Sequence, residues 1–229
     1  MQDKDATHQP GAVGKRIVPG PKKRKKSSIT REKILAAAEK VFGTYPYHQA
    51  SYRMIGMEAG IEHPLINYYF PSKSDLFRAV ITDIQSQRTV LQDQWFSEIK
   101  RMDPARGLSV HLDNVLDHYH RHPDGYRIIA LNIIQTTEIE QVPAFEILQS
   151  CLAEDMQNFA ERLKPPVPAY EIEMFTRSFS TLLINYLGSA SCYAAMLNLD
   201  PDSIQYLNWV KDTITYALLP RLEKMFQRG

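Results

Sequence analysis

Hydrophobic residues recur at helical spacing along most of the chain, and no strand-like alternation persists. The apolar positions between Ile34 and Phe42 predict an amphipathic helix over residues 30–43. Ser51 then stands where the N-cap of a second, short helix belongs, and Gly60 supplies a left-handed stop after it. The pattern therefore predicts an all-α protein.

A segment of about two turns lies between two prolines directly after this second helix, in the stretch GIEHPLINYYFPSK. Pro64 suits the first turn of a helix, where its missing N–H has no partner to lose, and Pro71 ends the segment. Ile66, Tyr69 and Phe70 share one face, which we expect to pack inward. Two short helices joined by a glycine turn, the second with an exposed polar and aromatic face, predict a helix-turn-helix.

Prolines divide the remainder of the chain into further expected helices. After a cap at Ser72 or Ser74, the expected spans are 74–101, 105–121, 124–136, 144–164, 169–198 and 202–227. The last two are long and rich in apolar side chains, and the small residues from Gly188 to Ser191 permit close helix approach. This pattern predicts self-association through a four-helix bundle, and hence a homodimer.

The pattern divides the chain into three expected segments. Residues 1–28, rich in Pro, Gly, Lys and Ser, are expected to form a disordered basic arm. Residues 29–74 are expected to form a three-helix domain containing the helix-turn-helix. Residues 75–229 are expected to form a larger helical domain for effector binding and dimerisation.

Positive charge is concentrated at the N-terminal end of the chain. Residues 1–31 hold nine Lys/Arg against Asp3 and Asp5, so their charge is +7 and the remainder carries −6 of the total of +1. A basic end on an acidic body favours a polyanionic partner, although a solvated tail or a nuclear-import signal shows the same pattern. Residues 32–75 contain four Lys/Arg and five Asp/Glu. The arm must then supply much of the non-specific attraction, for example from the minor groove.

Composition adds little to this picture. Hydrophobic residues make up 44% and charged residues 23%, which is ordinary for a soluble globular protein. The N-terminus is polar and shows no signal peptide. The uncharged stretch 178–199 contains too many polar residues for a membrane span and suits a buried helix. Cys151 and Cys192 are expected to be buried free thiols in a reducing cytosol, so we expect a cytoplasmic protein that contacts no membrane.

Three runs in the N-terminal region resemble one known family. They are R-x-x-I-L-x-A-A-x-x-V-F from Arg31, M-I-G-M-E-A-G-I from Met54 and Y-Y-F-P-S-K-S-D-L-F from Tyr68. Together, over residues 30–80, they resemble the DNA-binding domain of the TetR family of transcriptional regulators. The resemblance implies a repressor that binds a palindromic operator in double-stranded DNA as a twofold dimer and leaves it when a small-molecule effector binds.

The chain departs from the family pattern at three positions. Pro46 stands where the family often has Gly, and Ala50 stands where it has Thr. Asn67 replaces a tyrosine that usually contacts phosphate, although an amide can still donate to phosphate or to a base.

The expected DNA contacts lie on the second and third helices and at the start of the fourth. Arg53 is the best bidentate donor to guanine, and His63 and Asn67 can bond base edges. The remaining contacts are a thymine methyl for Pro64 or Leu65, phosphate or sugar for Tyr68, and phosphates at the helix starts marked by Ser51, Tyr52 and Lys73. Resemblance supports Arg53, Pro64, Tyr68 and Lys73 in these roles. Lys73 could instead be a solvated lysine, and His63 an exposed cap.

The middle helices are expected to enclose an effector pocket. Its expected lining is apolar and aromatic, with Tyr126, Ile129, Ile133, Phe145, Leu148, Phe159, Phe175 and Phe179. Arg127 and Arg177 are candidate anchors for a polar or anionic group, with surface ion pairs as the alternative. An apolar stripe is also what an ordinary core shows, and the resemblance is what favours a pocket.

One cluster raises the question of an enzyme. His111, Asp117, His118, His120 and His122 fall within twelve residues, and His118 and His122 could share a metal on one helix face. His122 precedes Pro123, however, where a helix usually ends. No phosphate loop, nucleophile elbow or carboxylate pair is present, so we expect no enzyme, no cofactor and no metal. The alternatives are a ligand-independent architectural DNA-binding protein and a metal-binding helical enzyme that uses this cluster.

Overall fold

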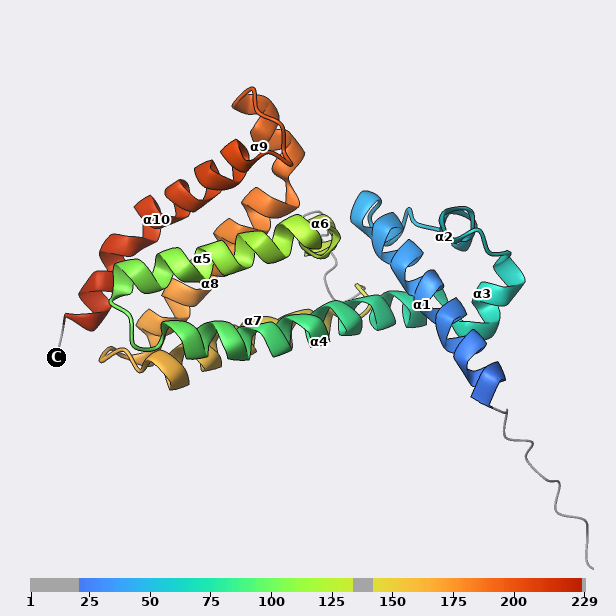
Figure 1. Cartoon of the computed structure of the whole chain (residues 1–229), viewed down its shortest axis with the longest axis horizontal. Coiled ribbons are helices and arrows are strands. Elements are labelled where there is room, and N and C mark those ends of the chain that lie inside the picture. Colours follow the sequence, from blue (N-terminus) through green and yellow to red (C-terminus); the bar gives the residue numbers. More distant parts are fainter. Residues whose placement is uncertain (1–20, 134–141, 228–229) are drawn as a thin grey trace, which may run out of the picture.

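The computed structural model describes residues 21–133 and 142–227, and every regular element in these ranges is a helix. The N-terminal unit contains α1 (Pro21–Thr44), α2 (Tyr52–Ala59) and α3 (His63–Tyr69). The long helix α4 (Lys73–Ile99) leads from this unit into a second bundle (Figure 1), which contains α5 (Pro104–Arg121), α6 (Asp124–Ile133), α7 (Phe145–Leu163), α8 (Ala169–Gly188), α9 (Ala190–Met196) and α10 (Ile204–Phe226). The all-α prediction, with its small N-terminal domain and larger helical domain, is confirmed.

Two hydrophobic cores correspond to the two parts of the chain. The first is built around Ile34, Phe42, Ile55 and Ile66, all with no exposed surface, and it joins α1, α2 and α3 to the first half of α4. The second fills the bundle with side chains from the far half of α4 and from α5, α7, α8, α9 and α10. The inward face that the sequence predicted for α3 is confirmed, because Ile66 and Phe70 are buried.

Helix α6 takes part in both cores. Its Ile128 is fully buried in the first core, whereas its Tyr126 packs against the second. On one side α6 contacts α1, and on another it contacts α8. At Gly188 in α8, an added Cβ would lie only 2.5 Å from Ala130 Cβ and 2.7 Å from the Tyr126 carbonyl oxygen. Gly188 thus permits a close helix approach, and the helix that approaches is α6 of the same chain; self-association through the last two helices stays a prediction.

A polar link also ties α6 to the connection between α1 and α2. The buried side chain of Asn132 accepts a hydrogen bond from the Tyr47 backbone N–H at 2.9 Å through Oδ1. Its amide nitrogen donates to the Ile128 carbonyl at 2.8 Å, so both ends of the amide are used. Because the amide is buried, this link fixes the end of α6 against the N-terminal domain.

Three expectations from the sequence differ from the structure. Disorder was expected throughout residues 1–28, but α1 begins at Pro21, since proline suits a first turn and Lys and Arg are good helix formers; residues 1–20 lie outside the described ranges. The helix expected over 169–198 is broken at Ser189, next to a glycine of low helix propensity. Cys192 is exposed rather than buried, because α9 turns Ala190 and Ala194 inward instead.

None of the helices in the described ranges combines the length and the apolar character that crossing a bilayer requires.

Candidate nucleic-acid interface and ligand pocket

The turn between α2 and α3 is set by local chemistry. Ser51 caps α2 as predicted, because its Oγ accepts the Met54 N–H at 3.3 Å. Gly60 adopts φ 62°, the left-handed conformation that favours glycine, and its N–H bonds the carbonyls at the end of α2. At Gly56 an added Cβ would meet the Ile61 carbonyl oxygen at 2.7 Å. Only glycine at this position lets the turn close.

The outward face of α3 carries the side chains that the sequence assigned to DNA. His63, Pro64, Leu65, Asn67 and Tyr68 are all exposed, with 78% of the Tyr68 surface accessible. Polar, aromatic and apolar groups thus lie together on a helix short enough to enter a major groove, which is what reading base edges requires.

Arg53 and Tyr52 lie next to each other on α2 but play different parts. The Arg53 side chain is exposed, as a base contact requires. The Tyr52 hydroxyl instead donates to the Phe70 carbonyl at 2.8 Å, and burial, with Asp75 nearby, raises the pKa of Tyr52 to about 12. Tyr52 therefore holds the end of α3 against α2.

Lys73 is largely occupied within the protein. Its Nζ donates to the carbonyl oxygens of Tyr47 at 2.8 Å and Ala50 at 3.0 Å, and it lies 4.4 Å from the centre of the Tyr47 ring. Burial lowers the pKa of this lysine. The ammonium thus fixes the α1–α2 connection with two of its three N–H groups. At the same helix start, Ser72 and Asp75 form a reciprocal capping box.

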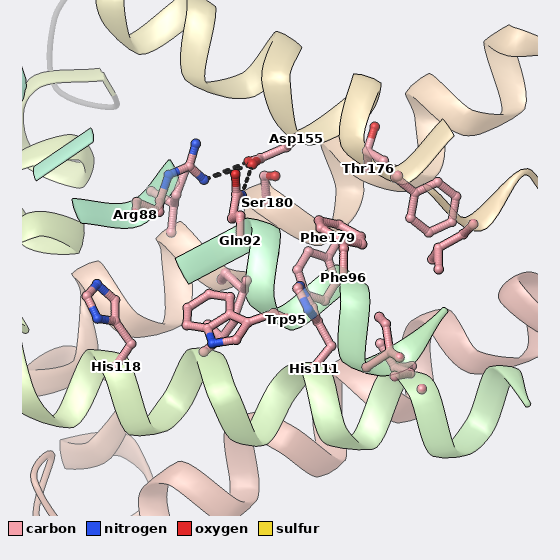
Figure 2. Close-up of a pocket in the computed structure, with 18 of the residues that line it drawn as sticks. Arg88, Gln92, Trp95, Phe96, His111, His118, Asp155, Thr176, Phe179 and Ser180 are labelled. Carbon is pink, nitrogen blue, oxygen red and sulfur yellow. Dashed lines mark hydrogen bonds and ion pairs between the residues drawn. The ribbon is translucent and has the colours of Figure 1, made fainter. Parts of the chain in front are cut away.

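A cavity of about 190 Å³ lies inside the second bundle, lined mainly by α4, α5, α7 and α8. Five predicted residues line it: Tyr126, Ile129, Phe159, Phe175 and Phe179. Residues of α4, α5 and α7 that the sequence did not single out for the pocket also line it, and Figure 2 labels several of them: Arg88, Gln92, Trp95, Phe96, His111, His118 and Asp155. Helical spacing does not distinguish such residues from ordinary core, so the sequence held no signal for them.

The other predicted pocket residues lie elsewhere or outside the described side chains. Phe145 is not part of the lining. The two candidate anchors are not part of the lining: Arg127 faces Asp124 at 3.7 Å, and the exposed Arg177 pairs with Glu173 at 2.8 Å one helical turn away. These are the surface ion pairs named as the alternative. The side chains of Ile133 and Leu148 lie outside the described residues.

The cavity wall contains one ion pair that crosses between helices. Asp155 on α7 accepts two hydrogen bonds from Arg88 Nη1 on α4, each 2.9 Å long, and a third from the side-chain amide of Gln92 (Figure 2). Both charged side chains are mostly shielded from solvent, at 23% and 16% exposure. Their mutual attraction is therefore less screened than that of a surface pair, and the pair fastens α7 to α4 beside the cavity.

Two histidines of α5 line the same cavity. The centre of the His111 ring lies 5.2 Å from the centre of the Phe96 ring and 5.5 Å from that of Phe179. The centre of the His118 ring lies 6.0 Å from that of Trp95. Burial lowers the pKa of His111 to about 4. Burial, followed by the charges of His122, Arg121 and Arg88, lowers the pKa of His118 to about 4 as well. Both rings are therefore neutral at pH 7.

These two pKa values predict that acid destabilises the fold. An unfolded histidine binds its proton near pH 6.5, whereas the folded rings bind theirs near pH 4. Stability is full above pH 6.5 and falls between these values by about 1.4 kcal/mol per pH unit for each ring. Urea unfolding at pH 7, 6 and 5 should show this loss, reduced in a His111→Phe, His118→Phe double variant. The exposed His120 provides the control substitution, and equal pH slopes in wild type and double variant would contradict the prediction.

The histidine cluster does not converge on a metal site. Within the ranges that the structure describes, no three His, Cys, Asp or Glu side chains lie together in a way that could hold an ion. The His118 and His122 rings lie next to each other, with centres 5.1 Å apart and planes tilted by 34°, while His120 is exposed on another side of α5.

Comparison with known proteins agrees with this geometry. Residues 34–80 match the family model described as bacterial regulatory proteins, tetR family. A transcriptional regulator from Legionella pneumophila has a TM-score of 0.58 at 17% identity, over 82% of this chain and 97% of that one. A TetR-like regulator from Rhodococcus sp. RHA1 has a TM-score of 0.57 at 18% identity, over 83% and 96%. FadR from Bacillus subtilis, solved with stearoyl-CoA, has a TM-score of 0.56 at 16% identity, over 80% and 97%.

These structural matches show a shared fold. Among curated proteins, no sequence relative is found.

Proposed function

Because the chain is a TetR-family transcriptional regulator with a helix-turn-helix DNA-binding domain, we propose that it is a repressor that binds a palindromic operator as a homodimer and is released by a small-molecule effector. The proposal rests on two features of the same chain: the exposed polar and aromatic face of α3, and the internal cavity of the second bundle. A ligand-independent DNA-binding protein has no need of such a cavity.

Helix α6 supports the proposed coupling between cavity and DNA. Its Tyr126 lines the cavity, while its Asn132 bonds the Tyr47 backbone in the N-terminal domain. Its Asp124 side chain also lies against Gly43 near the end of α1, within 2.9 Å of an added Cβ. A ligand that displaces Tyr126 therefore shifts α6, the helix that contacts the N-terminal domain. Such a ligand changes DNA binding only if its affinity differs between the shifted and the unshifted position of α6.

The last helices support the proposed dimer. Helices α8 and α10 leave large apolar side chains in contact with solvent: Tyr170, Met174, Ile204 and Tyr216 are 60%, 54%, 63% and 87% exposed. A second copy that covers these faces removes them from water and places two α3 helices on one duplex.

Selection of bound sequences from random duplex DNA tests the proposal directly. The purified protein should enrich an inverted repeat whose half-sites lie about one or more helical turns apart. Enrichment of a single half-site contradicts the dimeric mode, and no enrichment at all contradicts sequence-specific regulation.

The basic residues before Ser28 should dominate the salt dependence of DNA binding. Each phosphate contact that is lost reduces the slope of log K against log salt by about 0.9. Deleting residues 1–27 removes the KKRKK run and should flatten the slope by several such steps. Deleting residues 1–20 keeps that run and provides the matched control. A salt titration in which the longer deletion leaves the slope unchanged refutes this role.

A further inference from the structure

The cavity extends along α4 and α5. Its lining on α4 runs from Ile81 to Ile99, and its lining on the antiparallel α5 runs from His118 back to Pro104, with His122 just beyond the end of that helix. Eighteen residues of helix at 1.5 Å per residue correspond to a length of about 27 Å. Between the ends, the walls are mostly rings and aliphatic chains from four helices. An elongated and largely apolar ligand suits this shape.

Two polar side chains stand halfway along the cavity, on facing helices. Gln92 of α4 is 6% exposed. Its amide nitrogen donates a hydrogen bond to the Asp155 carboxylate, so the other end of the amide is the oxygen. Gln92 Oε1 and His111 Nδ1 are both buried and have no hydrogen-bond partner within the part of the chain that the structure describes. Buried polar atoms without partners are rare, so these two atoms indicate where a polar group of a ligand is received.

The unpaired atoms also define the chemistry of that group. A glutamine oxygen only accepts hydrogen bonds, so the ligand must donate to it. A neutral imidazole carries one N–H, which donates when Nδ1 holds the proton. A hydroxyl satisfies both, since it donates one hydrogen bond and accepts another. The terminal torsions of glutamine and histidine have broad energy wells, so modest rotation turns both atoms towards the cavity.

The charges around the cavity disfavour an ionic ligand group at this level. Arg88 and Asp155 neutralise each other across the wall, and His111 and His118 are neutral at pH 7. A carboxylate or an ammonium placed between Gln92 and His111 would lose its hydration without meeting a counter-charge.

We propose, building on the function proposed above, that the effector is an uncharged, elongated, hydrophobic molecule with a hydroxyl group that is held midway between Gln92 Oε1 and His111 Nδ1. The hydroxyl donates to Gln92 and accepts from His111. The apolar body of the molecule lies along the aromatic wall formed by Trp95, Phe96 and Phe179.

Three matched probes test this ligand class on the full-length protein by isothermal titration calorimetry at pH 7.5. They are 4-hexylphenol, its methyl ether 4-hexylanisole, and 4-hexylbenzoate. The phenol can donate a hydrogen bond, the ether can only accept one, and the benzoate is an anion of similar size. We expect 4-hexylphenol to bind about tenfold more tightly than either of the others. Equal binding of phenol and ether, or tighter binding of the benzoate, overturns the proposal.

Four single variants then locate the interaction. Gln92→Leu should weaken 4-hexylphenol binding about tenfold and leave 4-hexylanisole binding unchanged, because only the phenol can donate to Gln92. His111→Phe should also weaken 4-hexylphenol binding about tenfold, and it should weaken 4-hexylanisole binding as well, because both oxygens can accept from His111. Gln94→Leu and His120→Phe change exposed residues of the same types on the same helices and should change neither affinity. Unaltered phenol affinity in both cavity variants overturns the proposal.

The outcome for the ligand class is separable from that for the proposed function. DNA binding by the same preparations is measured by gel shift without any probe. Failure to bind an inverted repeat contradicts the proposed repressor function whatever the probes do. Intact DNA binding together with equal affinity for the phenol and its ether contradicts the ligand class alone.

Discussion

Replacing Arg53 and Asn67 together by alanine is expected to lower the preference for operator over random DNA by about 30-fold or more, because each well-formed base contact contributes about 1–3 kcal/mol of discrimination. Both side chains are exposed and take no part in either core, so the folded state should keep its stability. Competition gel shifts measure the ratio of specific to non-specific affinity. This ratio matters because loss of the Arg53 charge alone weakens binding to any duplex.

The control for this experiment makes the same chemical changes far from α3. Arg101 and Asn208 are exposed residues of the second part of the chain, and their replacement by alanine should leave the ratio unaltered. If the Arg53, Asn67 double variant is folded and retains the full preference, α3 and the start of α2 do not read the operator.

Gly188→Ala is expected to destabilise the protein by about 1–3 kcal/mol, which is the usual cost of forcing an extra methyl group into a packed site. The added carbon would lie 2.5 Å from Ala130 Cβ and 2.7 Å from a backbone oxygen of α6, and backbone cannot turn aside as a flexible side chain can. Helix α6 must therefore move away from α8. Thermal unfolding should show a loss of about 2–4 °C per kcal/mol for a protein of this size.

Gly107→Ala makes the identical change where there is space for it. The nearest atoms to an added Cβ at this position lie 3.8 Å away, and the residue sits inside α5. Here alanine should raise the melting temperature slightly, because glycine in a helix costs about 0.5–1 kcal/mol relative to alanine. Opposite signs for the two variants support a specific contact between α6 and α8. A loss of stability in neither variant would mean that α6 is not held as the structure places it.

The helix-turn-helix could be predicted from the sequence because its signals are local. A cap at Ser51, a left-handed glycine at position 60 and a proline early in α3 each act within a few residues, and each is found in the predicted conformation. The exposed and buried faces of α3 then follow from a repeat of 3.6 residues per turn. Roles that depend on distant partners were not visible, such as the bonds of Lys73 to a loop more than twenty residues earlier.

The cavity was only partly predictable for a related reason. Its aromatic lining was found because apolar residues at helical spacing face inward, whether they meet a core or a cavity. The Arg88–Asp155 pair joins residues 67 positions apart, and no local pattern indicates such a pairing. For the candidate anchors Arg127 and Arg177, the structure shows the alternative of surface ion pairs, because each has a carboxylate three or four residues away on its own helix.

The bonds inside the N-terminal domain have a consequence for how regulation evolves. Tyr52 fastens the end of α3, and Lys73 fastens the α1–α2 connection to the start of α4. The domain is thus locked internally, while α6 contacts it from outside. Under the proposed function, a small molecule that shifts α6 would tilt this rigid domain. It would change how often the operator is occupied and would not change which operator is bound. Amino-acid substitutions in the cavity lining would then change which effector is recognised without changing which operator is bound.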